Sequence, residues 1–436
     1  MKRRLLVLVC VLALGFSLGY LVRYGTTASR HRDPHLKASG PAARDDLRWK
    51  PLRSSSDEDV GRDLSALGYL QGYSPASERS GVTLHDPEKA WQGANLYVSG
   101  HGPTATLVGM DGEVLHEWTL GLEAICPETF DAEIDASLFY RHAEALPDGS
   151  LLVVFDYRAL ARIGPDSALL WKRCAPYHHD LAVGEDGRIY ALARAEGSLR
   201  PPLDGIPILD DEIHVLSTEG ELLEHVSVLD LLVDSDYRAI ATRITDGIEL
   251  ERSGDVLHTN SIEVLGPSPS GRLPEYQAGD LLISIRNLDT IAIVDLARGR
   301  TVWGFTGPWH AQHDATMLAD GNILLFDNLG LITLDAVERS RVLEIDPSTG
   351  ALAWTYDGRP DRGFGSTRCG TAQRLPNGNT LVTATEEGRA FEVTGEGEVV
   401  WEFWNPHRAG DDDELIASLF RVVRLAPEEV GWLPRR

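Results

Sequence analysis

From about residue 91 to its end, the chain alternates short apolar runs with turns. Runs such as SLLVVF, LLISI, NILLF and NTLVTA each follow an Asp-Gly, Gly-Asp or Asn-Gly pair. An apolar run of this length between two turns is typical of a buried β-strand. A tryptophan in a later strand follows these four runs, at Trp171, Trp303, Trp354 and Trp401. The same unit therefore recurs along the chain, and it is built of strands alone.

The repeat has a period of about 40 residues, which is typical of a β-propeller with four strands in each blade. We assign six blades, to residues 93–120, 140–172, 178–225, 257–305, 312–356 and 367–403. The first blade lacks a strand, which the run SLFRVVRLAP at 418–427 would supply, closing the ring. The sequence therefore predicts an all-β, six-bladed β-propeller over residues 91–436. Residues 226–250 break the strand pattern and predict a helical insertion.

The N-terminal residues 1–25 have the pattern of a membrane-targeting segment. Lys2, Arg3 and Arg4 precede an apolar stretch from Leu5 to Val22, which is long enough to cross a bilayer. A cleaved signal peptide and a retained anchor both fit this pattern, and we favour the anchor because no small-x-small cleavage site follows directly. In either case the rest of the chain is exported. We expect a single-pass protein of the cell membrane with its propeller on the periplasmic or extracellular side.

Residues 26–90 predict a linker with one short helix. The segment 26–56 is polar and rich in Pro, Gly, Ser and charged residues. After it, Ser56 and Asp57 are suited to cap a short helix in which Val60, Leu64 and Leu67 fall near helical spacing. We therefore expect the propeller to begin at 91.

The net charge argues against a nucleic-acid partner, and the cysteines raise the question of a disulfide. The chain has 41 Lys and Arg against 66 Asp and Glu, a net charge of −25, which would repel the phosphates of a nucleic acid. Cys126, Cys174 and Cys369 lie outside the apolar segment. Cys126 and Cys174 both fall in loop-like sequence and are the pair that we expect to form a disulfide, although three free thiols fit the sequence as well. No Cys or His spacing of a zinc motif is present.

Histidines recur at one position of the repeat. Four of them stand at the start of the first strand of a blade: His142, His179, His258 and His313. In the last repeat this position is Gly370, with Arg368 just ahead of it. Because the first strand of each blade lines the central channel, these side chains should converge on one spot. Arg286, on the strand after His258, should approach the same space.

The chemistry of this set favours an anion over a metal. Four imidazoles from separate blades could hold iron or zinc. However, the guanidinium of Arg286 stays charged, so it would oppose a cation and suit an oxyanion. We therefore expect neither a metal nor a cofactor in the channel.

Several segments carry a resemblance to a known family. GPWHAQHDATMLADGNILLFDN at 307–328 resembles the active-site strand of the bacterial arylsulfotransferases, which need no phosphoadenosine phosphosulfate. The segments 178–192, 257–265, 281–295 and 378–406 agree with it in order and context. The resemblance implies a six-bladed propeller and a ping-pong transfer through a sulfohistidine. The chain lacks room for the N-terminal β-sandwich of the long members, so it is similar to a short, membrane-anchored branch.

By the same resemblance, His313 is the nucleophile, and His179, His258 and Arg286 support it. We expect Arg286 and His258 to hold the sulfuryl oxygens of a phenolic sulfate ester. His179 would protonate the leaving phenolate and later deprotonate the phenol that accepts the group.

Four further residues belong to this hypothesis. We expect His142, Asn328 and Arg368 to line the substrate site, and Asp314 and Asn328 are candidates for orienting the ring of His313. Two other functions stay open: a non-catalytic, extracytoplasmic binding propeller and a histidine-ligated metal enzyme. The identity of donor and acceptor and the oligomeric state are also open at this point.

Overall fold

The computed structural model describes residues 72–135, 138–198, 207–242, 255–267, 273, 276–329, 339–358 and 363–433. The predicted membrane segment 1–25, the linker up to residue 71 and its predicted helix lie outside the described residues. Within the described ranges, no helix has the length and apolar character needed to span a bilayer.

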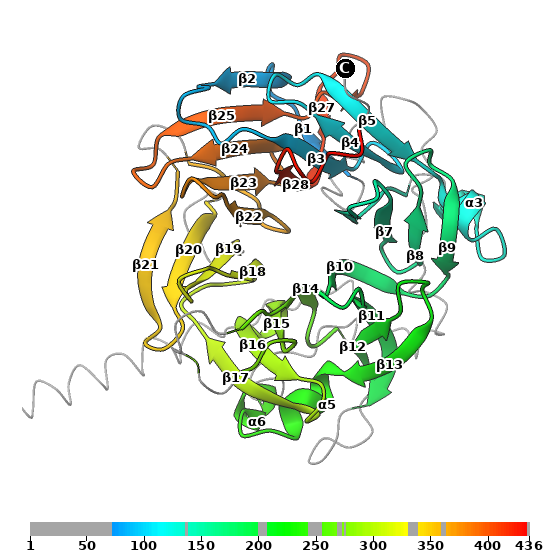
Figure 1. The fold of residues 1–436 in the computed structure, drawn as a ribbon, viewed down its shortest axis with the longest axis vertical. Coiled ribbons are helices and arrows are strands. Elements are labelled where there is room, and N and C mark those ends of the chain that lie inside the picture. The colour runs from blue at the N-terminus through cyan, green and yellow to red at the C-terminus, as the bar shows by residue number, and fades with distance from the viewer. Residues whose placement is uncertain are drawn as a thin grey trace, which may run out of the picture. The chain divides into compact units, whose positions relative to one another are not determined.

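Six antiparallel sheets of four or five strands surround a common axis in the described part of the chain (Figure 1). We number them as blades 1 to 6 along the chain, and their strands follow from the axis outward. Blade 1 has β28 (Leu419–Leu425), β3 (Ala94–Ser99), β4 (Thr104–Val108) and β5 (Val114–Thr119). Blade 2 has β6 (His142–Ala145), β7 (Leu151–Phe155), β8 (Ala159–Ile163) and β9 (Leu169–Arg173). Blade 3 has β10 (Tyr177–Val183), β11 (Ile189–Ser198), β12 (Pro207–Leu216) and β13 (Leu222–Ser227).

The other three blades repeat this arrangement. Blade 4 has β14 (Thr259–Val264), β15 (Leu281–Ile285), β16 (Thr290–Asp295) and β17 (Arg300–Thr306). Blade 5 has β18 (His313–Met317), β19 (Ile323–Asp327), β20 (Arg341–Asp346) and β21 (Ala351–Tyr356). Blade 6 has β22 (Thr371–Arg374), β23 (Thr380–Ala384), β24 (Arg389–Val393), β25 (Val399–Trp404) and β2 (Gly81–His85). The predicted all-β propeller is confirmed.

The C-terminal strand closes the ring. β28 pairs with β3 from Leu419 opposite Ser99 to Leu425 opposite Ala94, so the innermost strand of blade 1 comes from the other end of the chain. The strand that the sequence predicts at 418–427 is therefore present. Backbone hydrogen bonds thus join the C-terminal strand to the first blade, which covers the edge that β3 would otherwise leave unpaired.

The predicted linker, residues 26–90, includes residues that form strands in the structure. Residues 81–85 form β2, which pairs with β25 as a fifth strand of blade 6. Residues 73–75 form β1 (Tyr73–Pro75), which joins a small sheet with β27 (Leu415–Ala417) and β26 (Arg408–Ala409). The assignment of 72–90 to a linker was wrong, because these strands lie outside the repeat and cover an edge that β25 would otherwise leave unpaired.

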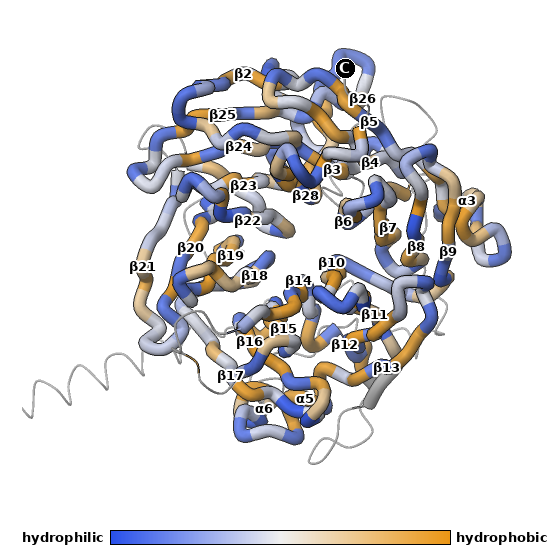
Figure 2. The backbone as a smooth tube through the Cα atoms, viewed as in Figure 1, coloured by the Kyte–Doolittle hydropathy of each residue, from blue (hydrophilic) through white to orange (hydrophobic). Residues whose placement is uncertain are grey.

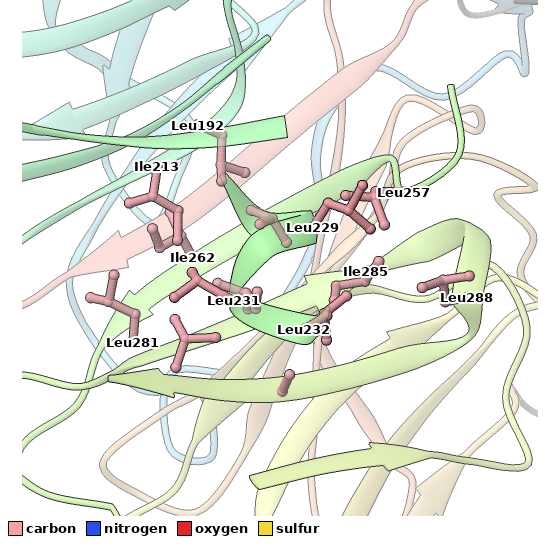
Figure 3. Close-up of a cluster of buried hydrophobic side chains, with 14 of the residues drawn as sticks. Leu192, Ile213, Leu229, Leu231, Leu232, Leu257, Ile262, Leu281, Ile285 and Leu288 are labelled. Carbon is pink, nitrogen blue, oxygen red and sulfur yellow. The ribbon is translucent and has the colours of Figure 1, made fainter. Parts of the chain in front are cut away.

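Helices interrupt the strands in a few places. The predicted insertion contains α5 (Val228–Val233) and α6 (Arg238–Thr242), while its last residues lie outside the described ranges. The side chain of Ser227 accepts a hydrogen bond from the backbone of Asp230 and caps α5. Figure 3 shows the α5 leucines Leu229, Leu231 and Leu232 in the apolar cluster between blades 3 and 4. The remaining short elements are α3 (Leu122–Ile125), α4 (Ala132–Asp135) and the 3-10 turn η3 (Arg286–Leu288).

The hydrophobic core is divided among the blades. The described residues form six apolar clusters, and each of them joins two neighbouring blades. In Figure 2 the hydrophobic positions concentrate in the strands, and the turns that connect them are largely hydrophilic. Glycine is required where the chain turns sharply between two strands. Gly149, for example, has a φ of +82°, and a Cβ there would lie 2.6 Å from the ring of Trp432. The ring is therefore stabilised blade against blade.

The predicted disulfide is present. Cys126 follows α3 and Cys174 follows β9, and their sulfur atoms are bonded. Cys369 is free and buried. The alternative of three free thiols was wrong.

Candidate active site

The beginnings of the innermost strands meet in one cavity. It is lined by Arg141, His142, His179, Asp180, Asn260, His313, Asp314, Cys369, Gly370, Thr371, Phe420 and Arg421. Each blade contributes to this lining, so the register that the sequence indicates does bring separate repeats together. Three of the four predicted histidines are in the lining. The fourth, His258, is next to them, with its ring centre 4.8 Å from that of His179.

Backbone irregularities direct these side chains. The ladders of β10, β14 and β18 each contain a register shift close to the histidine. His179, His258, Asp314 and Cys369 have φ values between +52° and +59°, in the left-handed region that residues other than glycine rarely adopt. A β-bulge redirects the side chain at its position, and backbone strain of this kind is concentrated at functional sites. The site is therefore built where the repeat departs from regular strand geometry.

Carboxylates of the preceding blade hold these segments in place. Three contacts of this kind cross between blades: Asp156 accepts from His179 N at 2.9 Å, Asp211 from Thr259 N at 2.6 Å and Asp289 from Ala311 N at 2.9 Å. Each bond fixes the backbone at or within two residues of a predicted catalytic histidine. The relative positions of the histidines thus depend on the contacts between blades.

The protonation state of His313 follows from its partners. Its Nδ1 lies 2.8 Å from Asn328 Oδ1 and 3.0 Å from Ala311 O. The amide nitrogen of Asn328 donates to Ser366 O at 2.7 Å and to Cys369 O at 2.6 Å, which orients its oxygen toward the imidazole. Because both neighbours of Nδ1 are acceptors, Nδ1 carries the proton. Nε2 is then the basic nitrogen, and it accepts a hydrogen bond from Cys369 N at 3.2 Å.

His313 is neutral at physiological pH. Burial lowers its pKa well below the usual range of an imidazole, and the positive charges of Arg286 and Arg141 lower the pKa further. A neutral imidazole keeps the lone pair on Nε2 that a nucleophile needs. Arg286, which the sequence assigned to the anion site, therefore acts electrostatically on the predicted nucleophile.

His179 and His258 have different surroundings. Burial, together with the charges of Arg141 and His258, holds the pKa of His179 well below its usual range. His258 is more exposed, and its Nδ1 lies 2.6 Å from Asp255 Oδ2. Although burial opposes it, this contact lowers the pKa of Asp255. Arg286 lies beside His258, because its backbone N–H donates to His258 O at 3.2 Å.

Arg141 is a buried cation that the sequence pattern did not single out. Its Nε lies 3.1 Å from Asp156 Oδ2, and its Nη2 donates to Cys369 Sγ at 3.1 Å. The guanidinium carbon is 4.8 Å from the ring centre of Phe420. Strand alternation places neighbouring side chains on opposite faces, so the residue before His142 was not expected at the channel. The sequence feature that could have pointed to Arg141 is its position directly before His142, a channel histidine.

Carboxylates line the cavity next to the histidines. His142 Nδ1 lies 2.8 Å from Asp180 Oδ1, and Arg421 Nη1 lies 3.5 Å from Asp314 Oδ1. Asp314 also accepts from Ala372 N at 2.7 Å, so it does not orient the ring of His313 as it was expected to. Asn328 performs that role. Arg421 comes from β28, the C-terminal strand that closes the ring. It reaches the cavity only because β28 pairs with β3, so the repeat pattern did not identify it.

Arg368 does not lie where its register suggested. It is exposed and outside the cavity lining, whereas the next two residues, Cys369 and Gly370, are buried in it. The segment before β22 is not regular strand. The position of Arg368, which was found by counting back from the Asn-Gly turn of this repeat, was therefore misjudged. The assignment of Arg368 to the substrate site stays a prediction, which its position outside the lining does not support.

The channel histidines are not arranged as a metal site. Within the described ranges, two groups of three or more ligating side chains are close enough to hold an ion. One contains the disulfide cysteines, the other is Glu212, His214 and His225, and neither includes a channel histidine. The geometry thus gives no support to the histidine-ligated metal enzyme.

Comparison with solved structures gives distant similarities. A protein of unknown function from Bacteroides caccae is 12% identical, with a TM-score of 0.49, over 76% of this chain and 98% of that one. Streptogramin B lyase is 11% identical, with a TM-score of 0.44, over 80% and 95% of the two chains. The WD40 β-propeller domain of Doa1 is 13% identical, with a TM-score of 0.42, over 80% and 97%. No curated protein matches the chain.

Comparison with protein families gives a direct result. Residues 142–406 match the profile of the family described as Arylsulfotransferase (ASST). This segment is more than half of the 436 residues and contains His142, His179, His258, Arg286 and His313. The resemblance found in the sequence is confirmed, and the chain belongs to the arylsulfotransferase family.

Proposed function

We propose that this protein is a six-bladed β-propeller arylsulfotransferase that moves a sulfuryl group from a phenolic sulfate ester to a phenol, with His313 as the intermediate carrier. The observation that supports this most is the state of His313: a buried, neutral imidazole with its proton fixed on Nδ1 and its lone pair on Nε2. The sulfate ester is itself the donor, so no nucleotide sulfate is needed.

In the first half-reaction, the Nε2 lone pair of His313 attacks the sulfur atom. A nitrogen–sulfur bond forms, the sulfur–oxygen bond to the aryl group breaks, and a phenolate leaves. The Nδ1–H stays hydrogen-bonded to Asn328 Oδ1, which stabilises the positive charge that develops on the ring. The Cys369 N–H, which contacts Nε2 in this structure, is released and then faces the transferred group. A phenol takes the group from Nε2 in the second half-reaction.

Two arginines are suited to the charge of the sulfuryl oxygens. Arg141 lines the cavity together with His313, and both Arg286 and Arg141 act on His313 electrostatically. Positive groups placed before the reaction stabilise a transition state in which charge spreads over the oxygens, as in phosphoryl transfer. Arg141 thus adds a second cation to the role that was expected for Arg286.

We assign the proton transfer to His258 in place of His179. An imidazole whose pKa is held far below neutrality, as that of His179 is, is a poor proton donor at physiological pH. The carboxylate of Asp255, at 2.6 Å from Nδ1 of His258, orients that ring and leaves Nε2 as the nitrogen that can reach the substrate. His258 would give its proton to the leaving phenolate and recover one from the acceptor phenol. His179 would then contribute a neutral hydrogen bond.

Leaving groups of different basicity test this assignment. A 4-nitrophenolate leaves without help, whereas an unsubstituted phenolate needs a proton. We expect His258→Ala to lower kcat/KM much more for phenyl sulfate than for 4-nitrophenyl sulfate, and His179→Ala to lower both equally. The opposite pattern would return the acid role to His179.

The disulfide supports export. Bonds such as that between Cys126 and Cys174 persist in oxidising compartments. We propose that residues 1–25 anchor the chain in the cell membrane, with the propeller on the periplasmic or extracellular side. Mass spectrometry of the mature N-terminus and protease access in intact cells would test retention and side.

The central experiment is sulfuryl transfer by the full-length chain. The protein is incubated with 4-nitrophenyl sulfate, with and without phenol, beside His313→Ala and a control variant of the neighbouring loop histidine, His310→Ala. We expect a stoichiometric burst of 4-nitrophenolate without phenol, turnover with phenol, and both lost in His313→Ala alone. The intact mass of the protein should rise by one sulfuryl group when phenol is left out. Steady release without phenol would indicate a hydrolase, and no release with or without phenol would leave a binding propeller.

A further inference from the structure

A second histidine cluster lies on the outer strands of blade 3, away from the channel (Figure 1). Glu212 and His214 come from β12, and His225 comes from β13. His214 Nε2 lies 3.0 Å from Glu212 Oε2, and His225 Nδ1 lies 3.4 Å from Glu212 Oε1. One ligand atom from each of the three side chains lies within 4.8 Å of the others.

Strand geometry brings these three groups to one face. Glu212 and His214 are two residues apart on β12, so their side chains point to the same side of the sheet. His214 is directly opposite His225 in the antiparallel pair of β12 and β13. Side chains opposite each other on one face are about 5 Å apart at Cβ, a spacing from which two imidazoles can reach one ion. The backbone that carries the cluster is held by the ladder.

The inner histidine is oriented by a further hydrogen bond. Its Nδ1 lies 3.1 Å from the hydroxyl oxygen of Tyr177, and that oxygen accepts from Arg173 Nε at 2.9 Å. Because Nε2 of His214 faces an acceptor, Glu212, it carries the proton here, and the hydroxyl of Tyr177 donates to Nδ1. An ion at Nε2 would release that proton to solvent, and the hydroxyl of Tyr177 can then turn to accept from Nδ1–H. Metal-binding histidines are commonly held by an outer oxygen acceptor in this way, which fixes the tautomer and the ring plane.

We propose that Glu212, His214 and His225 form a binding site for one zinc ion. Two imidazole nitrogens and one carboxylate are a ligand set that zinc takes in proteins, with water in the fourth position. The His225 side chain is 61% exposed, so the ion can enter from solvent and the ring can turn toward it. The net charge of −25 attracts cations, and the one positive neighbour in the hydrogen-bond chain, Arg173, lies behind Tyr177.

Zinc at this site would act on the fold and, through it, on the channel. It would join the outermost strand β13, with residues Leu222–Ser227, to β12. Through the bond of His214 to Tyr177 it would also secure β10, which carries His179 two residues further on. This role differs from sulfuryl transfer and does not depend on it.

Titration of the metal-free, full-length protein with ZnCl2 tests the proposal. Calorimetry should show one equivalent of zinc bound in the wild type and in His313→Ala, which removes a channel histidine. His225→Ala and Glu212→Gln should bind zinc at least about tenfold more weakly, and Tyr177→Phe about 10- to 100-fold more weakly. The control His310→Ala removes a histidine that also contacts a carboxylate, Asp289 at 3.1 Å, but has no second histidine in a metal-binding group, and it should bind as the wild type does.

Thermal unfolding gives an independent readout. Zinc should raise the Tm of the wild type and leave that of His225→Ala unchanged, while the two proteins melt alike without metal. The proposal is overturned if no zinc binds below millimolar concentration. It is also overturned if His225→Ala binds as the wild type does and His313→Ala does not, because the ion would then sit in the channel.

Discussion

Asn328, together with the carbonyl of Ala311, decides which nitrogen of His313 can react. Asn328 holds the imidazole only because its own amide is oriented by two backbone carbonyls, those of Ser366 and Cys369. With the amide fixed, its oxygen faces Nδ1 and the nucleophilic lone pair is confined to Nε2. A histidine that was free to exchange tautomers would spend part of its time with the lone pair pointing away from the cavity. The reactive state is therefore prepared before substrate binds.

Replacing this asparagine should lower kcat more than it changes KM. Asn328→Ala leaves the Nδ1–H with Ala311 O alone and frees the ring to rotate. Misplacement of a reacting group by about 1 Å costs on the order of 100-fold in rate, and we expect a loss of this size in kcat. Steady-state kinetics with 4-nitrophenyl sulfate and phenol measure it. Asn377→Ala, in the exposed β22–β23 turn, is the control, and an equal loss in both variants would refute the role.

The lowered pKa of His313 predicts how the first half-reaction responds to acid. An imidazole with its ordinary pKa of 6.5 would lose half of its neutral form at that pH. Because burial and two nearby arginines lower the pKa of His313, the neutral form persists at lower pH, and the rate should stay constant through 6.5. The burst of 4-nitrophenolate, whose departure needs no acid, reports this step between about pH 8 and 5.5. A half-maximal rate near pH 6.5 would show that the nucleophile is not shielded.

At the scale of the strands, one arrangement joins blade to blade. Asn379 and Arg424 both contact Glu392, and the Arg424 guanidinium lies over the ring of Trp401. Blade 5 repeats this: Asn322 and Arg374 contact Glu344, and Arg374 lies over Trp354. In each case the arginine comes from the innermost strand of the following blade. Trp354 and Trp401 therefore serve as platforms for an arginine of the next blade.

The Glu392–Arg424 and Glu344–Arg374 contacts differ in burial, so we expect their loss to lower the free energy of unfolding by different amounts. Glu392 and Arg424 are fully buried, so Glu392→Gln leaves an unpaired charge in the core and should lower the free energy of unfolding by about 3–5 kcal/mol. Arg374 is 27% exposed, so Glu344→Gln should cost about 1 kcal/mol or less. Urea unfolding of the two variants compares them. Equal costs would mean that burial does not set the strength of these contacts.

The repeat was predictable from sequence because its turns and apolar runs are local features. Gly149 marks a turn that no other residue fits well, and the runs after such turns are too short for helices. The positions of Arg141 and Arg368 were not predictable, because both residues lie in irregular backbone just before a strand. The alternation of side chains between the two faces of a strand does not extend to such a segment. The same holds for β2, since its partner β25 is more than 300 residues away along the chain. The orientation of Asn328 depends on carbonyls of another blade, which no local pattern encodes.

Over the whole molecule, charge opposes the substrate. The net charge of −25 repels an aryl sulfate anion at distances beyond the cavity, whereas Arg141 and Arg286 attract it only at close range. Salt screens the long-range repulsion, since the Debye length falls from about 30 Å at 0.01 M to about 8 Å at 0.15 M ionic strength. We therefore expect kcat/KM for 4-nitrophenyl sulfate to rise several-fold over this range.

The acceptor supplies the control for that measurement. Phenol is neutral, so its kcat/KM in the second half-reaction should stay nearly constant between the same two ionic strengths, as ping-pong kinetics with each substrate varied in turn would show. A rise for both substrates would point to a general effect of salt on the protein. A fall for the sulfate ester alone would mean that the cavity arginines govern its approach from the start, and that the net negative charge of the protein has little effect at the channel.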